Sequence, residues 1–141
     1  MGEPVTGSCL CGVVTYAVNQ QLGGIIACHC TDCQKAAGAG ASHNVVVKAA
    51  NVEVTGGEPK TYAKVVDSGR TLIRTFCGDC GSPLFSQRKE TPEMIVIKAG
   101  TLDDKADLNL VMDIWTDSAV GWIADDPDVE NHPGNRPVPK T

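Results

Sequence analysis

Apolar and β-branched residues occur along this chain in short runs rather than at helical spacing, and glycine, proline or polar residues bound each run. Short β-branched runs between turn residues are typical of strands. We predict strands over Val13–Val18, Gly24–Ala27, Asn44–Lys48, Asn51–Thr55, Thr61–Val66, Thr71–Phe76, Leu84–Gln87, Met94–Lys98 and Leu110–Trp115. The pattern therefore indicates a mainly β fold made of several small antiparallel sheets.

Helical signal is confined to three short segments. Thr31–Ala37 is predicted to form a short helix with Thr31 as its N-cap, stopped by Gly38. Leu102–Ala106 and Asp117–Val120 are each predicted to form one turn. From residue 125 onward the chain holds four prolines, several acids and no apolar pattern. We therefore predict one domain over residues 1–124 and a Pro-rich tail over 125–141, which lies over the domain or is partly disordered.

Composition and charge exclude several classes of function. A chain of 141 residues with 42% hydrophobic residues is long enough to bury a core of its own. The formal net charge of −5 opposes binding to a phosphate backbone, so no nucleic-acid partner is expected. No apolar run approaches the roughly 20 residues that cross a bilayer, and the first residues lack the pattern of a signal peptide. We expect a cytoplasmic protein that does not bind a membrane.

The seven cysteines occur only in clusters: Cys9-x-Cys11, Cys28-x-Cys30-x-x-Cys33 and Cys77-x-x-Cys80. In a reducing compartment such clusters bind metal far more often than they form disulfides. The odd number would also leave one thiol over in any scheme of disulfides. The spacing therefore indicates metal binding, and zinc is the metal that such thiolate sets hold.

Seven ligands divide naturally into four and three. The triplet is local enough to bind one ion, and the remaining two pairs supply the four thiolates of a closed structural zinc site: Cys9, Cys11, Cys77 and Cys80. Gly78 within the second pair and Gly81 after it favour the tight turn of a zinc knuckle. A second partition stays open, in which Cys30 and Cys33 join Cys77 and Cys80. That partition would leave Cys9, Cys11 and Cys28 without a site, whereas the division into four and three predicts two zinc ions per chain.

Three ligands leave a tetrahedral zinc with one free position, which is the mark of a catalytic site. A second structural site would result instead if His29, Asp32 or His43 filled that position. Three thiolates also make zinc a weak Lewis acid, better suited to binding an incoming thiol than to generating hydroxide. Cys28, Cys30 and Cys33 are therefore predicted to serve carbon–sulfur chemistry.

Five stretches carry a resemblance to a known family: Gly7–Gly12, Cys28–Lys35, Arg74–Phe85, Gly100–Asp104 and Ile114–Trp115. In this order they resemble the glutathione-dependent formaldehyde-activating enzymes. The resemblance implies a tent-like arrangement of antiparallel sheets around two zinc ions. It also implies that the four-cysteine set is the structural site and that the triplet is the catalytic one. The family's reaction joins glutathione and formaldehyde into S-hydroxymethylglutathione.

Two hypotheses of function follow. The first is a zinc-dependent carbon–sulfur lyase or synthase that acts on the glutathione adduct of formaldehyde or another small aldehyde. Its partners would be a small-molecule thiol and an aldehyde, and a homodimer is compatible with it. The second is a non-enzymatic, zinc-stabilised binding module that presents a pocket to a protein partner. Occupancy of the fourth position at the triplet distinguishes them, because a protein ligand there favours the module.

Further candidates are weaker. Lys35, Arg70, Arg74 and Arg88 are cations that would suit the carboxylates of glutathione, or are solvated surface charges. The small residues of Ala36–Ala41 would admit a substrate backbone or form a turn. Trp115 and Trp122 are expected in the core rather than in a pocket wall, and His132 has no expected role. His29 and water are the two candidate proton donors, and the sequence does not rank them.

Overall fold

The computed structural model describes residues 3–136, and these fall into two compact units. The first unit takes the described residues up to Gly23 together with Val45–Asp107. The second unit takes Gly24–Asn44 together with the described residues from Leu108 onward. Each unit is thus built from segments that are distant in the sequence.

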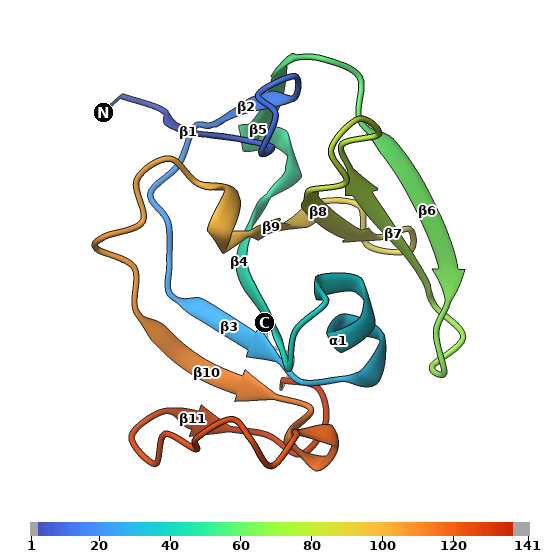
Figure 1. The fold of residues 1–141 in the computed structure, drawn as a ribbon, viewed down its shortest axis with the longest axis vertical. Coiled ribbons are helices and arrows are strands. Elements are labelled where there is room, and N and C mark those ends of the chain that lie inside the picture. Colours follow the sequence, from blue (N-terminus) through green and yellow to red (C-terminus); the bar gives the residue numbers. More distant parts are fainter. Residues whose placement is uncertain (1–2, 137–141) are drawn as a thin grey trace. The chain divides into compact units, whose positions relative to one another are not determined.

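The first unit contains two sets of strands. A three-stranded antiparallel sheet has the order β1 (Val5–Ser8), β2 (Thr15–Val18) and β5 (Val52–Gly56). The other set runs β6 (Lys60–Val65), β7 (Thr71–Phe76), β8 (Pro83–Arg88) and β9 (Met94–Lys98), each antiparallel to the next. β9 is also the neighbour of β4 (Ser42–Lys48), whose residues from Val45 onward belong to this unit. Figure 1 shows β6, β7 and β8 side by side. Single 3-10 turns occupy Ala49–Asn51 and Ala99–Thr101.

Tyr16 is the largest fully buried side chain of the first unit, with 1% of its surface exposed. Its ring meets Phe85 edge to face, with centroids 5.0 Å apart. Gly7 lies opposite Tyr16 on β1, where an added Cβ would stand 2.3 Å from the ring. The Tyr16 hydroxyl lies 2.7 Å from Oγ1 of Thr101. Burial raises the pKa of Tyr16 to about 12, because the charged form loses hydration.

The second unit holds β3 (Ile25–Cys28), the helix α1 (Thr31–Ala37), the first half of β4, and β10 (Leu110–Ile114). A 3-10 turn at Thr116–Ser118 and the short strand β11 (Glu130–Asn131) follow. β3 is antiparallel to β4 but parallel to β10, and β10 is parallel to β11. Figure 1 shows β3 and β10 side by side. Because their ends coincide, Cys28 lies opposite Ile114.

The prediction of a mainly β fold is confirmed, and each of the nine predicted strands overlaps an observed one. Two strands were missed. β1 has only four residues, including Gly7 and Ser8, and so has no apolar run. β11 has two polar residues and is held by backbone pairing with β10. The parallel pairing of β3 with β10 also departs from an all-antiparallel arrangement.

The predicted helix is confirmed at Thr31–Ala37, and it ends at Gly38, which has a φ of +64°. The predicted N-cap was wrong, because Cys30 takes that place. Cys30 has extended backbone angles, and its Sγ accepts a hydrogen bond from the Cys33 N–H at 3.2 Å. The turn predicted over Leu102–Ala106 was also wrong, because the helical turn lies just before it at Ala99–Thr101. The turn predicted over Asp117–Val120 lies one residue earlier and is shorter.

The predicted tail is described as far as residue 136, and residues 137–141 lie outside the described residues. Within it the His132 N–H donates to the Asp113 carbonyl at 3.0 Å. The His132 carbonyl accepts from the Thr116 N–H at 3.1 Å. His132, for which the sequence indicated no role, therefore ties this segment to the end of β10 through its backbone.

Over the described residues, no helix has the length and apolar character needed to cross a membrane.

Candidate metal centres

Four cysteines of the first unit form what we call the closed cluster: Cys9, Cys11, Cys77 and Cys80. Their sulfurs all lie within 4.8 Å of one another. The Cys9 and Cys11 sulfurs are 3.6 Å apart, and those of Cys11 and Cys77 are 3.8 Å apart. These separations are far too long for a disulfide, which needs about 2.05 Å. They match the roughly 3.8 Å between thiolates that share one tetrahedral zinc ion.

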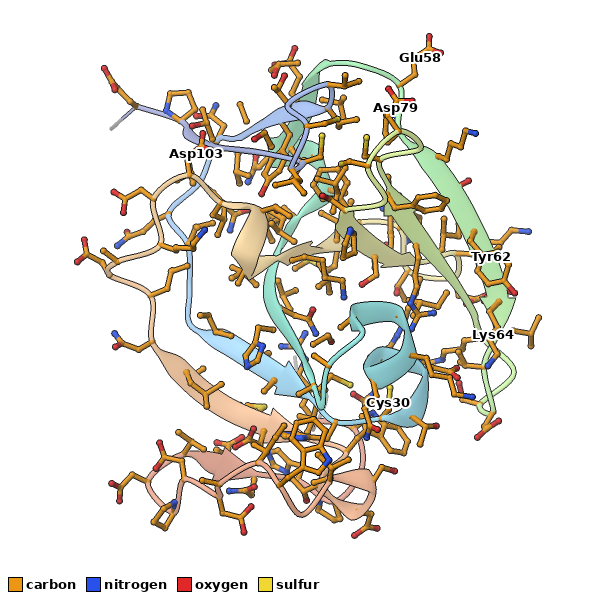
Figure 2. The ribbon with its side chains drawn as sticks, viewed as in Figure 1. Cys30, Glu58, Tyr62, Lys64, Asp79 and Asp103 are labelled. Carbon is orange, nitrogen blue, oxygen red and sulfur yellow. The ribbon has the colours of Figure 1, made fainter. Side chains whose placement is uncertain are left out.

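Two similar turns supply the closed cluster. Cys9–Cys11 precedes β2, and the chain leaves it through Gly12, which has a φ of +81°. Cys77–Cys80 joins β7 to β8 and is followed by Gly81, which has a φ of +80°. Glycine adopts this left-handed conformation without the steric cost that a Cβ brings. Figure 2 shows Asp79 on the second turn.

Ser82 connects these two turns. Its hydroxyl lies 3.2 Å from the Cys80 sulfur, and its Oγ accepts a hydrogen bond from the Leu10 N–H at 2.9 Å. The Ser82 hydroxyl, with the backbone N–H groups of Ser82 and Cys11, lowers the pKa of Cys80 to about 5. On the other turn the Val14 N–H donates to the Cys9 sulfur at 3.3 Å and lowers the pKa of that thiol. Such donors spread the negative charge of a thiolate site.

Cys11 shows why the closed cluster suits a cation. The Val13 N–H lowers the pKa of Cys11, but partial desolvation and the neighbouring thiols of the cluster outweigh it and raise that pKa to about 12. The Cys11 thiol therefore does not ionise at neutral pH unless a positive ion offsets the charge of its neighbours. The soft donors, their spacing and their N–H partners fit zinc.

The second unit holds the open cluster: Cys28, Cys30 and Cys33, whose sulfurs also lie within 4.8 Å of one another. Cys28 ends β3, Cys30 caps α1 and Cys33 lies in its first turn. Figure 2 shows Cys30 at the start of the helix. Cys28 and Cys33 are buried, whereas Cys30 is half-buried and is the most accessible of the three.

The thiols of the open cluster also resist joint ionisation. The thiols of Cys30 and Cys33, together with burial, raise the pKa of Cys28. The Cys28 thiol acts in the opposite direction on Cys30, but Cys33 and burial prevail, so the pKa of Cys30 is raised as well. The donor set therefore fits a cation here too, and three soft sulfurs favour zinc among the common metals.

Among residues 3–136, no fourth histidine, carboxylate or cysteine ligand joins the open cluster at comparable distance. The three sequence candidates for that place, His29, Asp32 and His43, all lie outside the group. His29 directs its Nε2 to Oδ1 of Asp113 at 2.8 Å, and His43 is exposed on β4. The cysteines thus assemble as four and three, and the partition that joined Cys30 and Cys33 to the second turn does not occur.

Comparison with known proteins adds the family. Residues 4–118 match the profile of the glutathione-dependent formaldehyde-activating enzymes, a segment that contains all seven cysteines. The chain belongs to this family. Membership of the family indicates a glutathione-dependent formaldehyde-activating function or a related one.

A solved structure shares the fold. A crystal structure of a Rhodobacter sphaeroides protein, determined as a structural genomics target, aligns with a TM-score of 0.58 and 19% sequence identity. The alignment covers 75% of this chain and 99% of the other. At this identity the likeness concerns the fold alone.

The four cations proposed to bind glutathione are divided between the units. Lys35 lies exposed on α1, in the same unit as the open cluster. Arg70, Arg74 and Arg88 belong to the first unit, where Arg74 is half-buried on β7. A carboxylate-binding role for these residues stays a prediction.

The expectation for the tryptophans was wrong. Trp115 is 40% exposed and Trp122 is 74% exposed, so neither is a core residue. Trp115 also has a φ of +59°, which bulky residues rarely adopt. The small residues after α1 have a packing reason at Gly40, where an added Cβ would stand 2.3 Å from Cδ1 of Ile123 and 2.8 Å from the Trp122 ring.

Sequence reasoning missed the contacts around His29. The carboxylate of Asp113 and the side chain of Gln34 both bind this residue. The sequence did not single out Asp113 or Gln34 as a functional candidate. One signal was present for Asp113, which is an acid inside the apolar run Leu110–Trp115. A pocket beside the pair is lined by His29, Asp113, Thr116, Ala119, Val120, Ile123, Ala124, Asp125 and Asn131. None of the seven cysteines is among these lining residues.

Proposed function

We propose that this protein catalyses the reversible addition of a thiol to a small aldehyde, with glutathione and formaldehyde as the substrate pair. In reaction terms it is a zinc-dependent carbon–sulfur lyase or synthase. One observation carries the proposal: three cysteine sulfurs converge in the second unit, and no fourth protein ligand joins them among the described residues. Membership of the formaldehyde-activating family supports the choice of substrates.

The two clusters take different roles in this proposal. Cys9, Cys11, Cys77 and Cys80 would hold a structural zinc ion, and Cys28, Cys30 and Cys33 would hold a second one, giving two per chain. When bound by the triplet, zinc would supply a centre with room for a fourth ligand, at which the substrate thiol is stabilised as its thiolate.

The chain's own groups prepare the open cluster for this chemistry. The Cys33 N–H donates to the Cys30 sulfur at 3.2 Å, and the Cys30 N–H donates to the Cys28 sulfur. These donors reduce the basicity of both sulfurs and fix their orientation. Because Cys30 is the most accessible of the three, a substrate thiol would approach on its side.

The bond changes balance without an oxidant or reductant. A thiolate sulfur forms a bond to the carbonyl carbon, the π pair moves to the oxygen, and that oxygen takes one proton. His29 is poorly suited to donate this proton, because it is 5% exposed and its Nε2 is bound to Asp113. Of the two sequence candidates, water is therefore the donor that we propose. Cytoplasmic location, where a reduced thiol pool persists, completes the proposal.

The decisive experiment measures exchange between free glutathione and its hydroxymethyl adduct at equilibrium by NMR. Added protein should accelerate the exchange, and Cys30→Ser should abolish the acceleration while reducing the zinc content from two to one. A matched control is Thr31→Ser, which alters the neighbouring exposed position without removing a ligand. Exchange at the uncatalysed rate with two zinc ions bound would instead support the zinc-stabilised binding module.

A further inference from the structure

His29, the residue between the first two sulfurs of the open cluster, is held by hydrogen bonds on three sides. Its N–H donates to the carbonyl of Ile114 at 3.0 Å. Its carbonyl accepts from Nε2 of Gln34 at 2.8 Å. Its ring meets Oδ1 of Asp113 at 2.8 Å through Nε2. A residue that is not itself in the cluster therefore has its backbone and its side chain fixed together.

The partners of His29 are themselves anchored. Asp113 and Ile114 lie on β10, which pairs with β3 in register at Cys28. The carbonyl of Asp113 also accepts from the His132 N–H. Gln34 lies on α1, and its Nε2 donates at the same time to the carbonyl of Ser118 at 3.0 Å. The hydrogen bonds thus come from a strand and a helix that are each tied to further segments.

Beyond the contact with Asp113, the His29 ring makes no hydrogen bond to another described residue. Nδ1 is buried and has no hydrogen-bond partner, and neither ring nitrogen joins the sulfurs of the open cluster. An ionised carboxylate only accepts hydrogen bonds, so Nε2 carries the hydrogen in the contact with Asp113. This tautomer leaves Nδ1 as a bare acceptor, which is less costly than a buried donor without a partner. The ring therefore serves the contact with Asp113.

We propose that His29 is the positioning residue of the open cluster, and that its three hydrogen bonds hold the Cys28–Cys30 segment in the conformation that converges the sulfurs on one metal ion. The inference rests on the metal-binding part of the proposed function and is independent of the reaction. Cys28 is held by strand pairing in any case. Cys30 caps α1, so the loss of the His29 contacts would free the start of this helix, with Cys30 and Cys33, to move relative to Cys28.

Without these contacts the loop must be ordered when the metal binds, which weakens binding. Loss of the groups that orient metal ligands typically costs about 10–100-fold in metal affinity. We therefore expect His29→Ala and Asp113→Ala to weaken metal binding at the open cluster by about that factor. His29→Gln keeps a donor near the position of Nε2, and Asp113→Asn keeps the acceptor Oδ1. Both should recover most of the affinity.

The test uses the full chain with zinc in the closed cluster and titrates cobalt(II) into the open cluster against a competing chelator. The thiolate-to-cobalt charge-transfer band reports the number and geometry of the sulfurs. We expect the band to be weaker or shifted in the two alanine variants and restored in His29→Gln and Asp113→Asn. Zinc release from the closed cluster should be the same in all variants, which controls for general loss of structure.

Two results would overturn the proposal. His29→Ala removes the ring contact with Asp113 and keeps the two backbone hydrogen bonds, whereas Gln34→Ala removes the contact to the His29 carbonyl. Unchanged cobalt affinity and an unchanged band in both variants would show that the contacts do not position the sulfurs. Loss of metal in His29→Gln as severe as in His29→Ala would indicate that the imidazole binds the metal directly. If the alanine variants do not fold, Gln34→Ala decides, because it removes the contacts to the His29 and Ser118 carbonyls, leaves the ring contact with Asp113 in place and should weaken cobalt binding. Normal cobalt binding without thiol–aldehyde exchange would refute the proposed reaction alone.

Discussion

The two cysteine clusters reach similar sulfur spacings by opposite means. The closed cluster joins two turns that are far apart in the sequence, since Cys11 and Cys77 are separated by 66 positions. The open cluster takes all three sulfurs from one segment, Cys28–Cys33. The closed cluster thus brings together distant segments of the first unit, whereas the sulfurs of the open cluster come from neighbouring positions of one segment. The comparison separates two cases. In the first unit the cysteines lie on distant segments that a shared ion would connect. In the second unit the cysteines are close in the sequence, and the surrounding strand and helix set their positions.

The largest expected effect follows from that contrast. Cys77→Ser should abolish cooperative unfolding and reduce the yield of soluble protein, because metal binding across a long loop contributes directly to folding. Cys30→Ser should lose one metal ion and keep a cooperative transition. Thermal unfolding followed by circular dichroism, with zinc analysis of each variant, measures both. Equal damage from the two substitutions would remove the distinction between the clusters.

Packing around glycine should also differ between the units. Gly7→Ala should destabilise the protein by about 3 kcal/mol, because the new Cβ would stand 2.3 Å from the buried Tyr16 ring and 2.6 Å from the Thr101 carbonyl. In the second unit Gly40→Ala should cost less than about 1 kcal/mol, because it meets the end of Ile123 and the exposed Trp122, which can move. Urea unfolding gives both values.

Gly100→Ala is the control for this pair, since its Cβ would meet nothing within 4 Å and its φ is not positive. It should leave the free energy of unfolding nearly unchanged. A cost at Gly40 as large as that at Gly7 would show that the second unit is packed as tightly as the first.

Ser82 tests how far hydrogen bonds support the closed cluster. Ser82→Ala removes the hydroxyl that contacts Cys80 and accepts from Leu10, so zinc should pass to a chelator about tenfold faster. Ser82→Thr keeps the hydroxyl and should release zinc at nearly the original rate. Both changes are made in a Cys30→Ser background, so that the closed cluster is the only site observed. An unchanged rate of zinc release in Ser82→Ala would mean that the Ser82 hydroxyl does not stabilise the closed cluster.

The smallest effect concerns alkaline pH. The pKa of Tyr16 is about 12 in the folded state and about 10 in an unfolded chain, so the unfolded state loses this proton first. The stability due to neutral Tyr16 is therefore complete below pH 10 and declines as the pH rises towards 12. Tyr16→Phe should have a shallower loss of stability over this window, measured by urea midpoints. Parallel curves for the two proteins would contradict the assignment.

Much of the fold was predictable because local patterns determine it. Each run of β-branched residues between turn residues became a strand, and Gly38 ended the helix where a left-handed residue was needed. Paired spacing likewise predicted two groups of cysteines. Such features depend on neighbours within a few residues.

The features that were missed depend on distant neighbours. β11 exists because β10 offers backbone groups to Glu130 and Asn131, and these residues carry no strand pattern of their own. Asp113 gained a role only when parallel pairing of β10 with β3 brought it beside His29. Cys30 displaced Thr31 as the helix cap because its sulfur, predicted as a metal ligand, also accepts a backbone N–H. Long-range pairing therefore limited the prediction more than local propensity did.

The division of the chain into two units has an optical consequence. Both tryptophans of the sequence, Trp115 and Trp122, belong to the second unit, and both tyrosines, Tyr16 and Tyr62, belong to the first. Selective excitation of tryptophan therefore reports on the unit that carries the open cluster, while tyrosine absorbance reports on the other. Because Trp122 is largely exposed, its emission is open to quenching by solutes added to the solvent. The native chain thus carries a separate intrinsic probe for each unit, without any label.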